Sequence, residues 1–65
     1  MFKMEFNTGN AAFCNEHTGE PDEASKAYEV ERILNEVSRR ITHQGYTEGS
    51  CFDVNGNKVG EWKLT

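Results

Sequence analysis

Apolar and charged residues alternate strictly in the first segment of the chain, which reads FKMEFN. Apolar side chains occupy every second position from Phe2 to Phe6, and the positions between them are charged. A two-residue period is typical of a strand with one buried face. We therefore predict a strand over residues 2–7. The polar segment 8–21 that follows predicts a loop, which Phe13 anchors to the core and which contains one helical turn.

A spacing of three and four residues then replaces the alternation and indicates an amphipathic helix. The apolar residues of this stripe are Ala27, Val30, Leu34, Val37 and Ile41, with Ala24 and Ile33 beside it. Pro21 suits the first helical position, and Gly45 suits the residue that follows a helix. We predict one helix of about 22 residues that begins at Pro21 and covers one face of a sheet.

Two further strands are predicted around the strongest turn signal in the chain. The dipeptide Asn55-Gly56 favours a two-residue type I′ turn, because both of its central residues need a positive φ. This turn joins strands over residues 47–54 and 57–64. The facing pairs that it predicts are Val54–Asn57, Asp53–Lys58 and Phe52–Val59.

The predicted register raises a question about the only tryptophan, Trp62. Strict alternation places Phe52 and Val59 on one face of the sheet and Trp62 on the other. A bulge at Gly60 adds one residue to the strand and returns Trp62 and Leu64 to the core. Without the bulge, Trp62 lies on an open face. We favour the bulge, because a small domain needs its largest apolar side chain inside.

These elements define the expected fold class. A chain of 65 residues is too short for two domains, so we expect one domain over residues 1–65. The predicted fold is α+β in the order β-α-β-β, with a three-stranded antiparallel sheet and one amphipathic helix packed on one face. The first strand is expected beside the third, and the second face of the sheet is expected to be open.

The charge is negative overall and unevenly distributed. The net charge is −4 at pH 7, whereas residues 1–36 alone carry −5. An acidic surface repels phosphates, so the composition argues against direct nucleic-acid binding and favours a basic protein as the partner. The first residues contain no long apolar run, which predicts neither a secretory leader nor a membrane span. We therefore expect a cytoplasmic protein with reduced cysteines.

The candidate partner-binding residues are the acids that cluster before and along the predicted helix. They are Glu16, Glu20, Asp22, Glu23, Glu29, Glu31 and Glu36. The alternative is an ordinary solvated helix face that ion pairs at four-residue spacing stabilise. Such pairs are Asp22–Lys26, Arg32–Glu36 and Glu36–Arg40.

The sequence contains no complete catalytic or metal-binding motif. Cys14 and His17 offer only two ligands, with His43 and Cys51 as distant partners, whereas zinc needs four that converge. A nucleophilic thiolate needs a base and a pocket, and one helix on three strands offers little concavity. We therefore predict that the protein is not an enzyme and has no catalytic residues, no metal site and no cofactor.

The order of the motifs resembles a group of small α/β proteins encoded by bacteriophages and mobile elements. The resemblance rests on NAAF at residues 10–13, on the helix that ends ILNEVSRRI, and on the pattern D-x-N-G-N-x-V-G-x-W at residues 53–62. In size, acidity and lack of catalytic residues, the chain is also similar to phage anti-CRISPR proteins that act on type I systems, such as type I-C.

The second resemblance implies a function. The protein is then an inhibitor that binds a host Cas subunit of a type I surveillance complex through an acidic, DNA-mimicking surface and blocks the binding of target DNA. We expect a monomer in the cytoplasm of the bacterial host, with no direct contact to nucleic acid or membrane. The alternative is a small phage structural or interaction protein that uses its open sheet face around Trp62.

Overall fold

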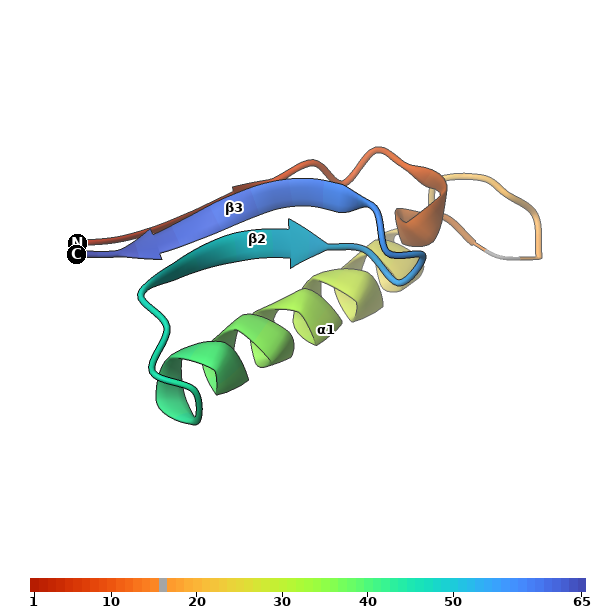
Figure 1. Ribbon diagram of the computed structural model, residues 1–65. Helices are drawn as coiled ribbons and strands as arrows, with labels where there is room; N and C mark the ends of the chain where they lie inside the picture. The colour runs from red at the N-terminus through yellow and green to blue at the C-terminus, as the bar shows by residue number, and fades with distance from the viewer. Residues whose placement is uncertain (16) are drawn as a thin grey trace.

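The computed structural model describes residues 1–15 and 17–65. Its elements are β1 (Phe2–Phe6), the 3₁₀ turn η1 (Ala11–Phe13), α1 (Glu23–Thr42), β2 (Glu48–Phe52) and β3 (Lys58–Leu64) (Figure 1). The strands form an antiparallel sheet in the order β1-β3-β2, and α1 packs on one face of it. The predicted α+β fold and the placement of the first strand beside the third are therefore confirmed.

Helix α1 begins at Glu23, two residues later than predicted. Asp22 is the N-cap, and its carboxylate accepts hydrogen bonds from the Ser25 backbone N–H at 3.1 Å and from the Ser25 hydroxyl at 2.8 Å. An N-cap residue keeps an extended backbone, so Pro21 precedes the helix instead of occupying its first turn. Gly45 follows the helix with a positive φ of 71°, in agreement with the predicted helix end.

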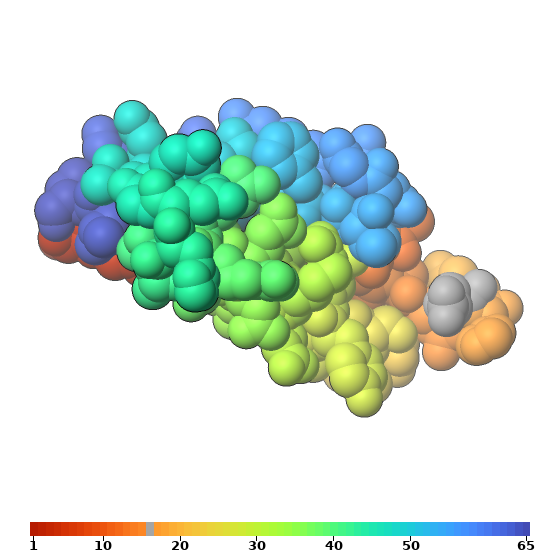
Figure 2. Space-filling view, turned by 60° about the horizontal axis from the view of Figure 1, so that its bottom comes forward, coloured from red at the N-terminus to blue at the C-terminus, as the bar shows by residue number. Residues whose placement is uncertain are grey.

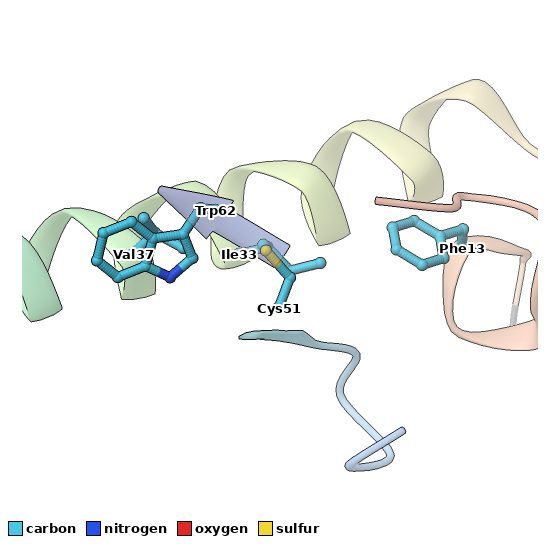
Figure 3. Packing of buried hydrophobic residues seen from close by; sticks show 5 residues of the cluster. All are labelled: Phe13, Ile33, Val37, Cys51 and Trp62. Carbon is cyan, nitrogen blue, oxygen red and sulfur yellow. The ribbon is translucent and has the colours of Figure 1, made fainter. Parts of the chain in front are cut away.

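The hydrophobic core lies between α1, η1 and the sheet (Figure 3). The hydrophobic side chains that are almost completely buried are Phe13, Ile33, Val37, Cys51 and Trp62. The ring of Phe13 stacks on that of Phe6, with centroids 6.3 Å apart. Phe13 therefore anchors the loop between β1 and α1, as predicted.

Only part of the predicted apolar stripe of α1 is buried. Ile33 and Val37 are buried, whereas Leu34 is 49% exposed and Ala27 is exposed. Glu29, an acid, is buried instead. The helix packs closer to β2 than to β1 (Figure 1), so its buried side is turned from the apolar stripe toward Glu29. No helix in the described residues has both the length and the apolar character needed to cross a bilayer.

The hairpin turn differs from the predicted type I′ turn. Gly56 has a positive φ of 85°, but Asn55 does not. The Gly56 N–H donates to the Asp53 carbonyl at 3.0 Å, and the Asp53 N–H donates to the Asn57 carbonyl at 2.9 Å. The loop therefore comprises the three residues 54–56 with glycine last, a common hairpin geometry. Because Asp53 faces Asn57, all three predicted facing pairs are wrong by one residue.

A β-bulge follows the turn and determines the position of Trp62. The register of β2 against β3 shifts between Cys51 and Phe52, and Val59 is the extra residue in β3. The bulge thus lies directly beside Gly60. Trp62 is only 2% exposed, so the interpretation with a bulge and a buried tryptophan is confirmed.

Three hydrophobic residues of the hairpin region lie outside the core, and the prediction that the bulge returns Leu64 to the core is therefore wrong. Phe52 and Leu64 are each 38% exposed, and Val54 is 63% exposed. The exposure of Phe52 follows from alternation along β2: its neighbour Cys51 faces α1, so the side chain of Phe52 points to the opposite face. Val54 belongs to the turn itself and not to a strand.

Two glycines allow close packing within the sheet. A Cβ atom on Gly60 would lie 2.0 Å from the carbonyl oxygen of Glu5 and 2.5 Å from the Cα of Phe6. A Cβ atom on Gly49 would lie 2.8 Å from Nε1 of Trp62. Gly60 therefore lets β1 approach β3, and Gly49 leaves room for the indole, whose N–H has no hydrogen-bond partner in the described residues.

Candidate functional site

Accessible carboxylates gather at the start of α1 and along its outer side. We call this set the acidic surface, and it comprises Glu20, Asp22, Glu23 and Glu31. Three of the four are exposed, and Asp22 is partly exposed. The Lys26 ammonium lies 3.5 Å from the Glu23 carboxylate. Because the side chain of Glu23 is 94% exposed, solvent screens the pair and little of the negative charge is neutralised. Glu16, another predicted site residue, lies outside the described residues.

Asp22 has a structural role within the acidic surface. Its pKa is lowered, first by the hydrogen bond from the Ser25 hydroxyl and then by those from the Ser25 and Ala24 backbone, which together outweigh its partial burial. The carboxylate is therefore charged at neutral pH. Because it caps the positive end of the helix dipole, part of its charge is used within the fold.

Glu29 and Glu36 do not belong to the acidic surface, although the sequence placed them there. Glu29 is 6% exposed, and its carboxylate accepts hydrogen bonds from Arg32 and, at 3.2 Å, from the Val54 backbone N–H. Glu36 accepts from Arg32 at 3.2 Å and from Arg40 at 3.0 Å. Two acids and two arginines thus neutralise one another, so neither carboxylate is free to bind a partner.

Arg32 joins this network to the hairpin. Its second terminal nitrogen donates to the Phe52 carbonyl at 2.8 Å. Desolvation opposes the charged guanidinium, but its hydrogen bond and attraction to Glu29, followed by those to Glu36, raise the pKa of Arg32 further above its usual value. The predicted pairs Arg32–Glu36 and Glu36–Arg40 are present. Both pairs lie within α1, whereas the contacts of Arg32 with the Phe52 carbonyl and of Glu29 with the Val54 N–H connect the helix to β2 and the turn.

Tyr28 is a candidate site residue that is not among those predicted from the sequence. Its side chain is 74% exposed, and it lies one helical turn before Glu31, on the side of α1 that faces away from the sheet. Aromatic residues are enriched where protein interfaces are strongest. The signal in the sequence was its position outside the apolar stripe, which leaves a large ring without a place in the core.

The residues that carry the phage-protein resemblance form a structural link. The Asn10 side chain accepts from the Ala12 N–H at 3.0 Å, which caps η1, and donates to Asp53 at 2.8 Å. The Asp53 carboxylate also accepts from the Asn55 and Asn57 N–H groups, each at 2.9 Å. Burial opposes the charged form, yet the hydrogen bonds from Asn57, Asn55 and Asn10 lower the pKa of Asp53. The NAAF segment at residues 10–13 and the motif at residues 53–62 therefore stabilise the contact between η1 and the hairpin.

The two cysteines are free thiols in different environments. Cys51 is buried, and burial, followed by the nearby carboxylates of Glu36 and Glu61, raises the pKa of its thiol. A raised pKa disfavours the nucleophilic thiolate. Cys14 is half-buried, and its thiol lies 3.5 Å from the Asn10 carbonyl. In residues 1–15 and 17–65, no three histidine, cysteine or carboxylate side chains lie close enough to share a metal ion.

The sheet face opposite α1 is polar. By alternation, the strand residues that point to it include Lys3, Glu5, Glu48, Glu61 and Lys63. Trp62 lies on the covered side, so it cannot anchor an interface on this face.

No family model, no curated protein and no solved structure matches this chain. Its chemistry must therefore be judged from the side chains themselves. Tyr28 adds one exposed aromatic ring beside the acidic surface, on the same helix. Such a surface is suited to bind a basic protein through charge and one apolar contact.

Proposed function

We propose that the protein binds a basic, DNA-binding subunit of a host type I CRISPR–Cas surveillance complex and blocks the binding of target DNA. The observation that carries the proposal is the accessible acidic surface at the start of α1, in which Glu20, Glu23 and Glu31 are exposed. The resemblance to small acidic phage inhibitors supports the choice of partner.

The proposed mechanism is competition for a DNA-binding groove. A subunit that holds duplex DNA presents lysine and arginine side chains to its phosphates. Carboxylates on a rigid helix attract the same side chains, and they exclude the duplex when the complex forms.

The spacing of the carboxylates limits how closely they imitate DNA. Glu23 and Glu31 are separated by about 12 Å along the helix axis, over which a duplex carries about seven phosphate charges. The acidic surface has fewer charges than that. Tyr28 is therefore assigned a share of the binding energy, and we expect affinity to fall with salt less steeply than for a duplex.

A second candidate is a structural or interaction protein that uses its open sheet face. This alternative requires Trp62 at the centre of the contact. The buried position of Trp62 removes that anchor, and the remaining side chains of the face are mainly charged. The acidic surface is therefore the better supported candidate.

The test is capture of a purified type I-C surveillance complex by the tagged protein, combined with a mobility-shift assay for target duplex. The site variant is E23Q/E31Q, and the matched control is E48Q/E61Q, which removes the same charge from the open sheet face. We expect the wild type and the control to bind and to inhibit, and the site variant to bind about tenfold more weakly. Y28A is expected to weaken binding as well.

Two results would contradict the proposal. The first is a wild-type protein that neither binds the complex nor displaces the duplex. The second is equal inhibition by the site variant and the control at low salt, which would show that these carboxylates make no contact. Circular dichroism spectra of all variants verify that the fold persists.

A further inference from the structure

Strand β1 forms one edge of the sheet, and half of its backbone groups point away from β3. Met1 and Thr65 exchange hydrogen bonds, and the Asn7 N–H donates to the Val59 carbonyl at 2.8 Å. In an antiparallel pair, residues that bond to the neighbouring strand alternate with residues that do not. The odd-numbered residues of β1 therefore bond to β3. The N–H and C=O groups of Phe2, Met4 and Phe6 point outward and have no partner in the described residues.

The apolar surface beside this edge is incompletely covered. Phe2 is 47% exposed, and Met4 and Phe6 are only partly buried. On α1, Glu29 and Arg32 contact the hairpin, so the opposite flank of the helix, with Leu34, lies on the side of β1. Figure 2 shows the α1 side of the molecule, with β2 and the hairpin above the helix. Apolar side chains of β1 and α1 thus adjoin a free edge.

The charges of β1 are poorly matched within the chain. Lys3 faces Lys63 on β3, and Glu5 faces Glu61. Like charges that face each other directly across strands are destabilising. None of these four residues forms an ion pair in the described part of the chain. Each charge of β1 is therefore open to an opposite charge supplied from outside the free edge.

We propose that two copies of the chain pair through β1 and form a two-fold symmetric dimer with one continuous sheet. The sequence FKMEF is complementary to itself when it runs antiparallel around Met4. Lys3 of each copy then faces Glu5 of the other, Phe2 faces Phe6, and Met4 faces Met4. The self-complementary charges and the free apolar edge argue for a second copy as the occupant.

The hydrogen-bond pattern agrees with this register. The outward backbone groups belong to Phe2, Met4 and Phe6, and these are the residues that pair with one another around the axis at Met4. Lys3 and Glu5 then form the pairs without hydrogen bonds, in which side chains lie closer together. The dimer also places the two uncovered flanks of α1 on the same side of the joined sheet, next to the paired β1 strands. A monomer is expected from the sequence, and sedimentation equilibrium decides between the monomer and the dimer.

The experiment is sedimentation equilibrium of the isolated protein, with no partner present, on four samples: the wild type, K3E, E5K and the double swap K3E/E5K. Each single variant turns both intermolecular pairs into like-charge pairs, and the dimer is expected to weaken about tenfold. The double swap restores opposite charges and is expected to recover the wild-type dissociation constant. An equimolar mixture of K3E and E5K is expected to form a heterodimer, because its pairs are again opposite in charge.

A control for folding is built into the design. K3E places a glutamate opposite Lys63, and E5K places a lysine opposite Glu61, so each single variant removes a repulsion within the monomer. We expect the single variants to dimerise less while the monomer resists urea at least as well as the wild type. A wild type that stays monomeric at 1 mM, or a double swap that dimerises no better than the single variants, would overturn the proposal. The acidic surface is untouched, so this result is separate from the test of the proposed function.

Discussion

Glu29 and Glu31 lie two residues apart on α1 and are expected to respond in opposite ways to the same change. Replacement of each by glutamine removes one negative charge and keeps the shape of the side chain. Glu29 is buried against Arg32 and the Val54 N–H, whereas Glu31 is exposed and forms no ion pair in the described residues. E29Q is expected to lower stability without a specific effect on binding. E31Q is expected to weaken partner binding without an effect on stability.

The size of the effect of E29Q follows from the contacts that the carboxylate makes. A hydrogen bond to a charged group contributes about 1.5–3 kcal/mol. Glutamine keeps an oxygen that can still accept one of the two bonds, and Arg32 keeps its contact with Glu36 at 3.2 Å. Because Arg32 is 38% exposed, solvent screens part of the interaction. We therefore expect a loss of about 1–2 kcal/mol, which corresponds to a decrease of about 7–15 °C in melting temperature for a chain of this size.

The assay is urea and thermal unfolding, followed by circular dichroism and by the fluorescence of Trp62, whose indole is buried in the folded state. Binding is measured in parallel as the capture of the type I-C complex. Unfolding of E29Q at the same urea concentration as the wild type would contradict this role, because it would show that the hydrogen bonds of the buried carboxylate contribute nothing to stability. A loss of stability in E31Q instead would contradict it as well.

Two further predictions concern the sheet and the turn. Gly60→Ala is expected to cost about 3–5 kcal/mol, because its Cβ overlaps the backbone of Glu5. Gly49→Ala meets the side chain of Trp62 and no backbone atom, and it is expected to cost less, about 1–2 kcal/mol. Urea unfolding that ranks the two variants in reverse would contradict the packing. Asp53 has a folded-state pKa below its ordinary value of 3.8, so its contribution to stability is present above that value and is lost as the pH falls through the folded-state pKa. Asp53→Asn is therefore expected to show a smaller drop in urea midpoint between pH 7 and pH 3 than the wild type, and an equal drop would contradict this role.

The elements of the fold could be predicted from the sequence because local signals determine them. The alternation from Phe2 to Phe6 matched β1 almost residue for residue, and the hydrophobic spacing located α1. The turn could not be predicted correctly, because the dipeptide rule considers only Asn55 and Gly56. The carboxylate of Asp53 accepts the Asn55 and Asn57 N–H groups and stabilises a three-residue loop instead.

The acidic residues show a different limit of sequence reasoning. Their number and approximate position were apparent, but their division into structural and free carboxylates depends on which side of α1 meets the hairpin. Leu34 belongs to the apolar stripe and is half-exposed, whereas Glu29 lies outside the stripe and is buried. The contact that makes the difference is the Val54 N–H, 25 residues away in sequence, which the periodicity of a helix cannot reveal.

The two proposals concern different parts of the chain and have a joint consequence. The dimer forms through β1, whereas the acidic surface lies at the start of α1 and along its outer side. The two contacts therefore have no residue in common. A dimer presents two acidic surfaces, one on the α1 helix of each copy, and the continuous sheet holds them together. A surveillance complex with two suitable basic sites then gains avidity, because the second contact becomes intramolecular. On such a target, K3E is expected to bind more weakly than the wild type although its acidic surface is intact, whereas on a single isolated subunit the two are expected to bind equally.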